Sequence, residues 1–304
     1  MSCLIVNADD FGLTAGVNRA IAELHRAGVL TSATLMARAA ATDEAIQIVR
    51  ALPSLDVGCH VVLVDGELAL SAREEIPHLA NRSDGRFRPS LIGFLNWLAR
   101  DSQRRWPFRA RAIREIEAET AAQIASLQDK GIRLTHIDTH KHTHMFPAVL
   151  RPVLWAARAA GIRSVRNPFE PAWSLRATIN APWLRRTEVS LLRRLEPAFR
   201  RIVAEEGFTT TDGAIGVLAT GSLNAAAISS LLQQMPPGTW ELVTHPGYND
   251  ADLARAHTRL LASRETEREA LLALEQLPEV ELISFFDLTT DAQQEVSPLR
   301  SAAS

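Results

Sequence analysis

Residues 4–36 read LIVNADDFGLTAGVNRAIAELHRAGVLTSATLM, and this stretch indicates the fold. It opens with a short apolar run at 4–6 that leads to two adjacent aspartates. The following segment, 14–27, places apolar side chains such as Val17, Ile21 and Leu24 on one face of a helix, and Gly28 is a typical stop. Residues 32–36 then read as a second strand. A strand, a helix and a strand in this order predict a βαβ unit with parallel strands.

The same alternation continues along the chain. Further strands are predicted at 56–63, 134–139, 163–166, 214–218, 241–244 and 281–285. Further helices are predicted at 43–52, 110–130, 147–160, 225–234 and 255–277. About eight strands in 304 residues fit an irregular, TIM-barrel-like (β/α) barrel of the α/β class better than an open sheet. We expect one domain over 1–290 and a flexible tail over 291–304, with the functional residues at the C-terminal ends of the strands.

Two stretches interrupt the rhythm, at about 65–106 and 168–208, and both are predicted to be loop and helix insertions at the catalytic rim. They carry four tryptophans, which either pack the insertions themselves or contact a ligand: Trp97, Trp106, Trp173 and Trp183. Arginines are dense at 100–114 and 185–201. These are solvated helix faces or, alternatively, a surface for an anionic lipid or a phosphorylated sugar.

Composition narrows the class of protein. The chain is 46% hydrophobic with a formal net charge of −2, which is typical of a globular protein and argues against nucleic acid as the main partner. Its two cysteines, Cys3 and Cys59, are too few for a disulfide framework and suggest free thiols in a reducing compartment. With neither a signal-peptide pattern nor a membrane-spanning run, a cytoplasmic protein without stable membrane insertion is expected.

The candidate catalytic and metal-binding residues lie at the ends of the predicted strands. Asp9 and Asp10 end the first strand; neighbouring strand residues point to opposite faces unless the chain bends, and Gly12 permits a bend. His60 lies in the third strand, and His245 follows the seventh. Either histidine taken alone is as readily a hydrogen-bonded core residue, and the aspartates alone could cap the next helix.

Residues 135–144, THIDTHKHTH, change this balance because they hold four of the nine histidines. Alternation places His136, Asp138 and His140 on one strand face, with His142 and His144 beyond it. Packing does not require such a cluster, so a metal site is favoured over a hydrogen-bonded network. Imidazoles combined with carboxylates suit Zn²⁺ or another first-row ion, whereas Mg²⁺ prefers oxygen ligands.

These segments, in this order, resemble the YdjC-like carbohydrate deacetylase family (the ChbG/HpnK type). The resemblance rests on VNADDFG at 6–12, GCH at 58–60, HIDTHKHTH at 136–144 and HPGY at 245–248. It implies a barrel-like α/β fold and the removal of acetyl groups from N-acetylated sugars with one divalent metal ion, Mg²⁺ or Zn²⁺.

The resemblance also implies roles. Asp10, His60 and His140 are the expected metal ligands, and Asp9 is the expected general base. His245 is assigned as general acid by analogy with other metal-dependent sugar deacetylases. Three further residues are expected to support the ligands or contact the substrate: Asp138, His142 and His144.

The partners implied are an N-acetylated sugar substrate, a second copy of the chain as a homodimer, and peripheral membrane contact if the substrate is a lipid. Two other functions stay open at this point: another metal-dependent hydrolase, such as a phosphoesterase, and a non-catalytic sugar-binding protein. Phosphoryl chemistry often uses two metal ions with basic groups near the phosphate, and Lys141 is the one lysine beside the predicted site.

Overall fold

The computed structural model describes residues 2–102, 111–178, 181–256, 258–274 and 280–289. The strands are β1 (Ser2–Phe11), β2 (Ser32–Leu35), β3 (Asp56–Val61), β4 (His136–Thr139), β5 (Ser164–Val165), β6 (Gly213–Ile215), β7 (Gly238–Thr244) and β8 (Val280–Leu282). The helices that accompany the sheet are α1 (Ala15–Arg26), α2 (Thr42–Ala51), α4 (Arg111–Gln128), α5 (Pro147–Ala159), α9 (Ala225–Gln233), α10 (Ala251–Arg255) and α11 (Ala262–Leu272). A 3₁₀ segment, η2 (His140–Met145), follows β4.

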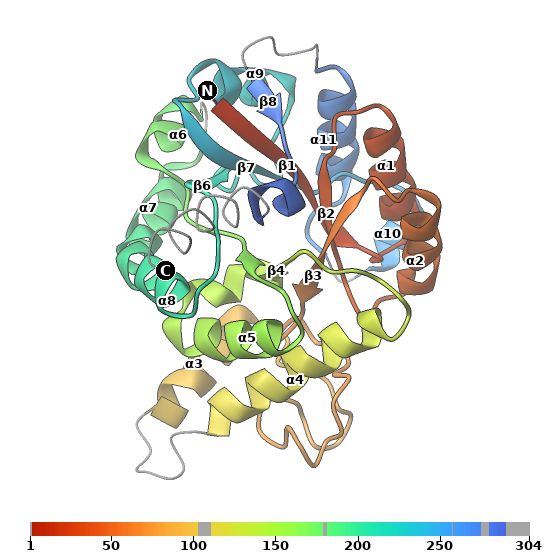
Figure 1. Ribbon diagram of the computed structural model, residues 1–304, viewed down its shortest axis with the longest axis vertical. Coiled ribbons are helices and arrows are strands. Elements are labelled where there is room, and N and C mark those ends of the chain that lie inside the picture. Colours follow the sequence, from red (N-terminus) through yellow and green to blue (C-terminus); the bar gives the residue numbers. More distant parts are fainter. Residues whose placement is uncertain (1, 103–110, 179–180, 257, 275–279, 290–304) are drawn as a thin grey trace, which may run out of the picture.

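The strands form one parallel sheet that curls into an irregular barrel, as the sequence predicts. Neighbours follow the order β5-β4-β3-β2-β1-β7-β6, and β8 pairs with the first residues of β1. The two ends of this order approach each other, because the Val165 N–H donates to the Thr209 carbonyl (3.0 Å) and the Ala214 N–H to that of Phe169 (3.2 Å). Helices surround the sheet (Figure 1). The C-terminal ends of the strands therefore meet at one rim.

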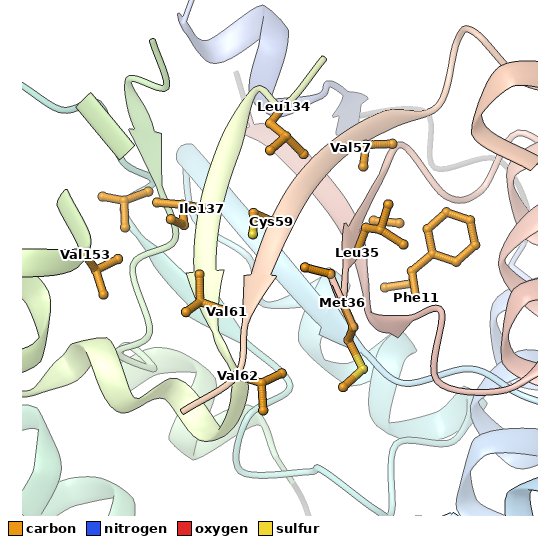
Figure 2. Close-up of a cluster of buried hydrophobic side chains, with 14 of the residues drawn as sticks. Phe11, Leu35, Met36, Val57, Cys59, Val61, Val62, Leu134, Ile137 and Val153 are labelled. Atoms are coloured by element: carbon orange, nitrogen blue, oxygen red, sulfur yellow. The ribbon is translucent and has the colours of Figure 1, made fainter. Parts of the chain in front are cut away.

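The two faces of the sheet differ in polarity. Along β1, Leu4, Val6 and Ala8 belong to the main apolar core, which lies between the sheet and the helices. Figure 2 shows part of this core, with side chains from β1 to β4 and from α5. The alternate residues Asn7 and Asp9 are also buried but join a polar network on the inner face. A polar interior of this kind requires paired charges, and it brings the charged strand residues together.

His136 lies at the opposite end of the barrel from the rim. Its ring stacks on Phe285, with centroids 3.9 Å apart, and burial lowers its pKa to about 3. A Cβ on Gly58 would lie 2.5 Å from its Nε2 atom, so Gly58 provides the space for the ring. The prediction that His136, Asp138 and His140 share one strand face is wrong for His140, because β4 ends at Thr139 and His140 begins η2.

The insertions are folded rather than open. The first contains α3 (Leu91–Ser102) and the second contains α6 (Ala172–Ala177), α7 (Trp183–Leu192), η3 (Arg193–Leu195) and α8 (Glu196–Glu205). Glu115 and Glu119 of α4 hold the first insertion by accepting its backbone N–H groups, among them those of Leu79 (2.6 Å) and Leu70 (2.9 Å). Trp106 and the predicted tail lie outside the described residues.

One predicted helix is wrong. The sequence pattern suggests a single helix over 255–277, but α10 ends at Arg255 and α11 begins at Ala262. The residues between the two helices contain no proline or glycine that would mark the break, and Arg264 in the first turn of α11 donates to Asp10 of β1. None of the described helices combines the length and apolar character needed to cross a membrane.

Candidate metal centre

A bend in β1 turns both aspartates towards the barrel interior. The pairing of β1 with β2 shifts between Ala8 and Phe11, and Asp10 has a left-handed backbone with φ of 61°. The bend thus begins at Asp10 and continues at Gly12 (φ 94°), whereas the sequence indicates only Gly12. Non-glycine residues rarely adopt this conformation, and where they do the surrounding structure holds them in it.

Three candidate ligand atoms form a compact triangle. Asp10 Oδ1 lies 3.4 Å from His60 Nε2 and 3.3 Å from His140 Nδ1, and the two nitrogens are 3.2 Å apart. Asp10 Oδ1 is buried, and none of the described residues donates a well-aligned hydrogen bond to it. Because Zn–N and Zn–O distances are about 2.0–2.2 Å, separations of this size are those expected between neighbouring ligands of one ion.

Each member of the triangle is held from behind by a different charged residue. Arg264 Nη2 donates to Asp10 Oδ2 (2.5 Å), which leaves Oδ1 facing the histidines. His60 Nδ1 donates to Asp138 Oδ1 (2.8 Å), which leaves Nε2 as the ligand atom.

The support of His140 comes from the first insertion. His140 Nε2 donates to Asp65 Oδ2 (3.1 Å), and Lys141 Nζ donates to Asp65 Oδ1. This contact leaves Nδ1 of His140 for the triangle. A ring N–H held by a carboxylate is typical of histidines that bind metal ions.

The electrostatics of the triangle fit a cation. Burial alone would lower the pKa of His60, but the Asp138 charge and the close contacts with Asp10 and Asp138 raise it to about 10. The pKa of His140 is also raised, by Asp10 and Asp65 acting against burial. Burial opposes ionisation of Asp10, yet Arg264 and the two histidines hold its pKa well below the usual range. The pocket therefore favours added positive charge, which protons or a divalent ion can supply.

A second cluster of candidate ligands, formed by Asp9, His60 and Asp138, fits a cation less well than the first triangle does. The buried guanidinium of Arg166 occupies its carboxylates: Nη2 contacts Asp9 Oδ1 (2.6 Å), Nη1 contacts Asp9 Oδ2 (2.8 Å), and Nη1 also contacts Asp138. A metal ion there would lie against this positive charge. The donor set of Asp10, His60 and His140 is the better site.

Comparisons with known proteins show the family to which this chain belongs. The model of the family described as YdjC-like protein matches residues 3–277. This chain belongs to the YdjC family. Two relatives named carbohydrate deacetylase align over 94% of the chain and 99% of their own length, at 29% identity in Brevibacillus brevis and 31% in Listeria monocytogenes.

Two further likenesses cover less sequence or show only the fold. A Salmonella heidelberg protein named chitooligosaccharide deacetylase is 38% identical over 160 residues, which are 52% of this chain and 57% of that one. A crystal structure from Enterococcus faecalis, of a candidate cellobiose-phosphate cleavage protein, has a TM-score of 0.71 at 24% identity and covers 94% of this chain and 98% of that one. The Enterococcus faecalis structure supports the fold of this YdjC family member.

Asp9 lies beside the triangle in this YdjC family member. Its Oδ1 accepts hydrogen bonds from Asn7 Nδ2 (3.0 Å) and Thr34 Oγ1 (3.2 Å) in addition to Arg166. Burial would raise the pKa of Asp9, but the charges of Arg166 and His60 hold it well below its usual range. Asp9 is therefore ionised, and Oδ2 is its less occupied oxygen.

His245 faces Asp9 across the pocket. Its Nε2 lies 3.8 Å from Asp9 Oδ2, and burial lowers its pKa to about 4 against the opposing effect of Asp9 and Asp10. The backbone N–H of His245 donates to Glu267 Oε2 (2.6 Å), and the Gly247 N–H donates to the Arg264 carbonyl (3.1 Å). Helix α11 thus fixes both the His245 loop and Asp10.

The two remaining histidines lie outside the triangle. His144 is buried and joins Thr139 Oγ1 (2.8 Å) to the Arg166 carbonyl (3.2 Å), so it ties η2 to the end of β5. His142 has a left-handed backbone (φ 52°), and its buried Nδ1 has no hydrogen-bond partner among the described residues. The geometry gives His144 a structural contact and leaves His142 available to contact a ligand.

Sequence reasoning missed three residues of this centre: Arg166, Arg264 and Asp65. Arg166 closes the predicted strand at 163–166, and a charged residue ending a buried strand was the available signal. Asp65 lies at the start of the first predicted insertion, and Arg264 lies inside the helix predicted over 255–277. Neither had a local signal, because the partners are 75 and 254 residues away along the chain.

Proposed function

We propose that this protein is a metal-dependent carbohydrate deacetylase that hydrolyses the acetamide of an N-acetylated amino sugar. The supporting observation is the triangle of Asp10, His60 and His140, the first two buried and the third partly exposed, in a chain that aligns over nearly the whole length of a carbohydrate deacetylase. These three residues would hold one divalent ion. Two imidazoles and one carboxylate suit Zn²⁺, and Mg²⁺ is the alternative.

The ion would contribute Lewis acidity towards a carbonyl oxygen and would make a water molecule more acidic. The protein's own residues do the rest. Asp9 is ionised and fixed by Arg166, and its Oδ2 has acceptor capacity on the side of His245. Asp9 would take a proton from the water that attacks the acetamide carbon.

Arg166 makes Asp9 a weak base, so a proton at Oδ2 is held only briefly. His245 lies 3.8 Å away and is neutral near pH 7, because its pKa is about 4. It would receive this proton and transfer it to the sugar nitrogen as the C–N bond breaks. The products are acetate and a free amino sugar, and the water supplies both the added oxygen and the transferred proton.

The test is a deacetylation assay with metal-replete protein. N-acetylglucosamine, its β-linked disaccharide and a lipid-linked form are incubated with protein carrying Zn²⁺ or Mg²⁺, and free amine and acetate are measured. We expect Asp9→Asn to abolish turnover while the metal content stays at that of the wild type. His140→Ala should lose the metal itself.

Near-normal activity of Asp9→Asn would refute the base assignment. Phosphate release from p-nitrophenyl phosphate with two bound ions, and no amine from any sugar, would instead favour a phosphoesterase. Sugar binding without either product would favour a binding protein.

A further inference from the structure

Helix α7 presents three large apolar side chains to solvent. Trp183 is 76% exposed, Leu184 65% and Leu191 56%. An α-helix turns about 100° per residue, so these three side chains share one face with Thr187, while Val189 on the opposite face is buried. A helix face that is merely solvated carries mostly polar residues, whereas this one is mostly apolar.

Positive charge is concentrated in the segment of sequence that carries this face. Residues 172–201 contain seven arginines and two glutamates, although the whole chain has a formal charge of −2. Both glutamates are already paired, Glu188 with Arg185 (3.2 Å) and Glu196 with Arg200 (2.9 Å). Within the described part of the chain, Arg193 and Arg194 at the end of α7 have no ion-pair partner.

The face lies beside the rim that carries the candidate metal centre. Helix α7 follows β5, and in Figure 1 it lies on the outside of the molecule between α6 and α8. Arg185 Nη2 in its first turn donates to the Val217 carbonyl (3.4 Å), just beyond the C-terminal end of β6. A surface that docks through α7 would therefore lie close to the strand ends.

We propose that the exposed face of α7 docks onto an anionic phospholipid surface. A tryptophan and two leucines on one side of a helix, with arginines following its last turn, are features of helices that lie in a membrane interface. The apolar side chains would enter the headgroup region, and the exposed Arg194 would reach the lipid phosphates together with the guanidinium end of Arg193. The positive charge favours this occupant over a second copy of the chain, because two such faces would repel each other.

The test is co-sedimentation of the whole chain with vesicles at low salt. The vesicles are either pure phosphatidylcholine or phosphatidylcholine with about 30% phosphatidylglycerol, an anionic lipid. We expect binding to the anionic vesicles, at least about tenfold weaker binding to the neutral ones, and a decrease with added salt. The triple variant Trp183→Ser, Leu184→Ser, Leu191→Ser should bind vesicles at least about tenfold more weakly than the wild type. The double variant Arg193→Gln, Arg194→Gln should bind more weakly only to the anionic vesicles.

Ile92→Ser is the matched control, because Ile92 is 73% exposed but lies on α3. It should bind vesicles as the wild type does. Circular dichroism checks that the variants are folded, and none of the changed residues lies in the metal centre. No wild-type binding, equal binding by the triple variant, or an equal loss in Ile92→Ser would overturn the proposal. So would a dimer in light scattering that the triple variant dissociates, since the face would then bind a second copy.

Discussion

The Asp65 carboxylate offers a direct test of how the metal centre is built. It accepts the Nε2–H of His140 at 3.1 Å and is buried, while the His140 side chain is 23% exposed. Removing an outer carboxylate of this kind typically lowers metal affinity by about 10–100-fold. For Asp65→Asn we expect about tenfold, or about 1.4 kcal/mol, because an amide oxygen still accepts the hydrogen bond and His140 is partly solvated. Asp65→Ala removes both acceptor atoms and should approach a loss of about a hundredfold.

The assay is titration calorimetry of the metal-free protein with Zn²⁺ at fixed pH. Asp43→Asn is the matched control, since Asp43 also pairs with a lysine (Lys130, 2.7 Å) but lies on the exposed surface of α2. Lys141→Met separates the lysine contact from the histidine contact and should change affinity little. If Asp65→Asn binds Zn²⁺ within about twofold of the wild type, Asp65 does not position His140.

Three further outcomes follow from the same contacts. Metal affinity should rise with pH between about 6 and 9, because His60 has a pKa of about 10 in the metal-free protein and must lose its proton to bind the ion. Calorimetry in buffers of different ionisation enthalpy should detect the protons that are released. Metal binding without proton release would contradict this prediction. Arg166→Met leaves buried carboxylates unpaired and should lower the free energy of unfolding by about 3–5 kcal/mol, measured by denaturant titration. The control Arg151→Met changes a half-exposed arginine and should cost less than about 1 kcal/mol. Equal losses in the two variants would refute the importance of burying the Arg166 ion pairs. Gly58→Ala should lower the free energy of unfolding by about 1–3 kcal/mol, because the added Cβ crowds the His136 ring. In thermal denaturation, adding His136→Ala to this variant should restore part of the lost stability. If it does not, the clash with His136 is not the cause of the loss.

Local patterns in the chain go far towards the architecture. The alternation of apolar runs and helical stretches predicts a parallel barrel because each segment reveals its own periodicity. Strand ends reveal polar residues for the same reason, but the choice of Asp10, His60 and His140 among them comes from the resemblance to the YdjC-like family. The pattern fails where one residue's environment depends on distant segments: His136 looks like its neighbours in sequence but lies against Phe285 at the other end of the barrel.

By itself the sequence determined the order of strands and helices and the residue types that arrive at the rim. The tertiary structure alone decided which of them act together: the left-handed bend at Asp10, the support of Asp10 by Arg264 and of His140 by Asp65, and the fork of Arg166 on Asp9. The physical reason is that periodicity reports only on neighbours a few residues apart. A buried charge, in contrast, is stabilised by whichever opposite charge the folded chain brings within hydrogen-bond distance.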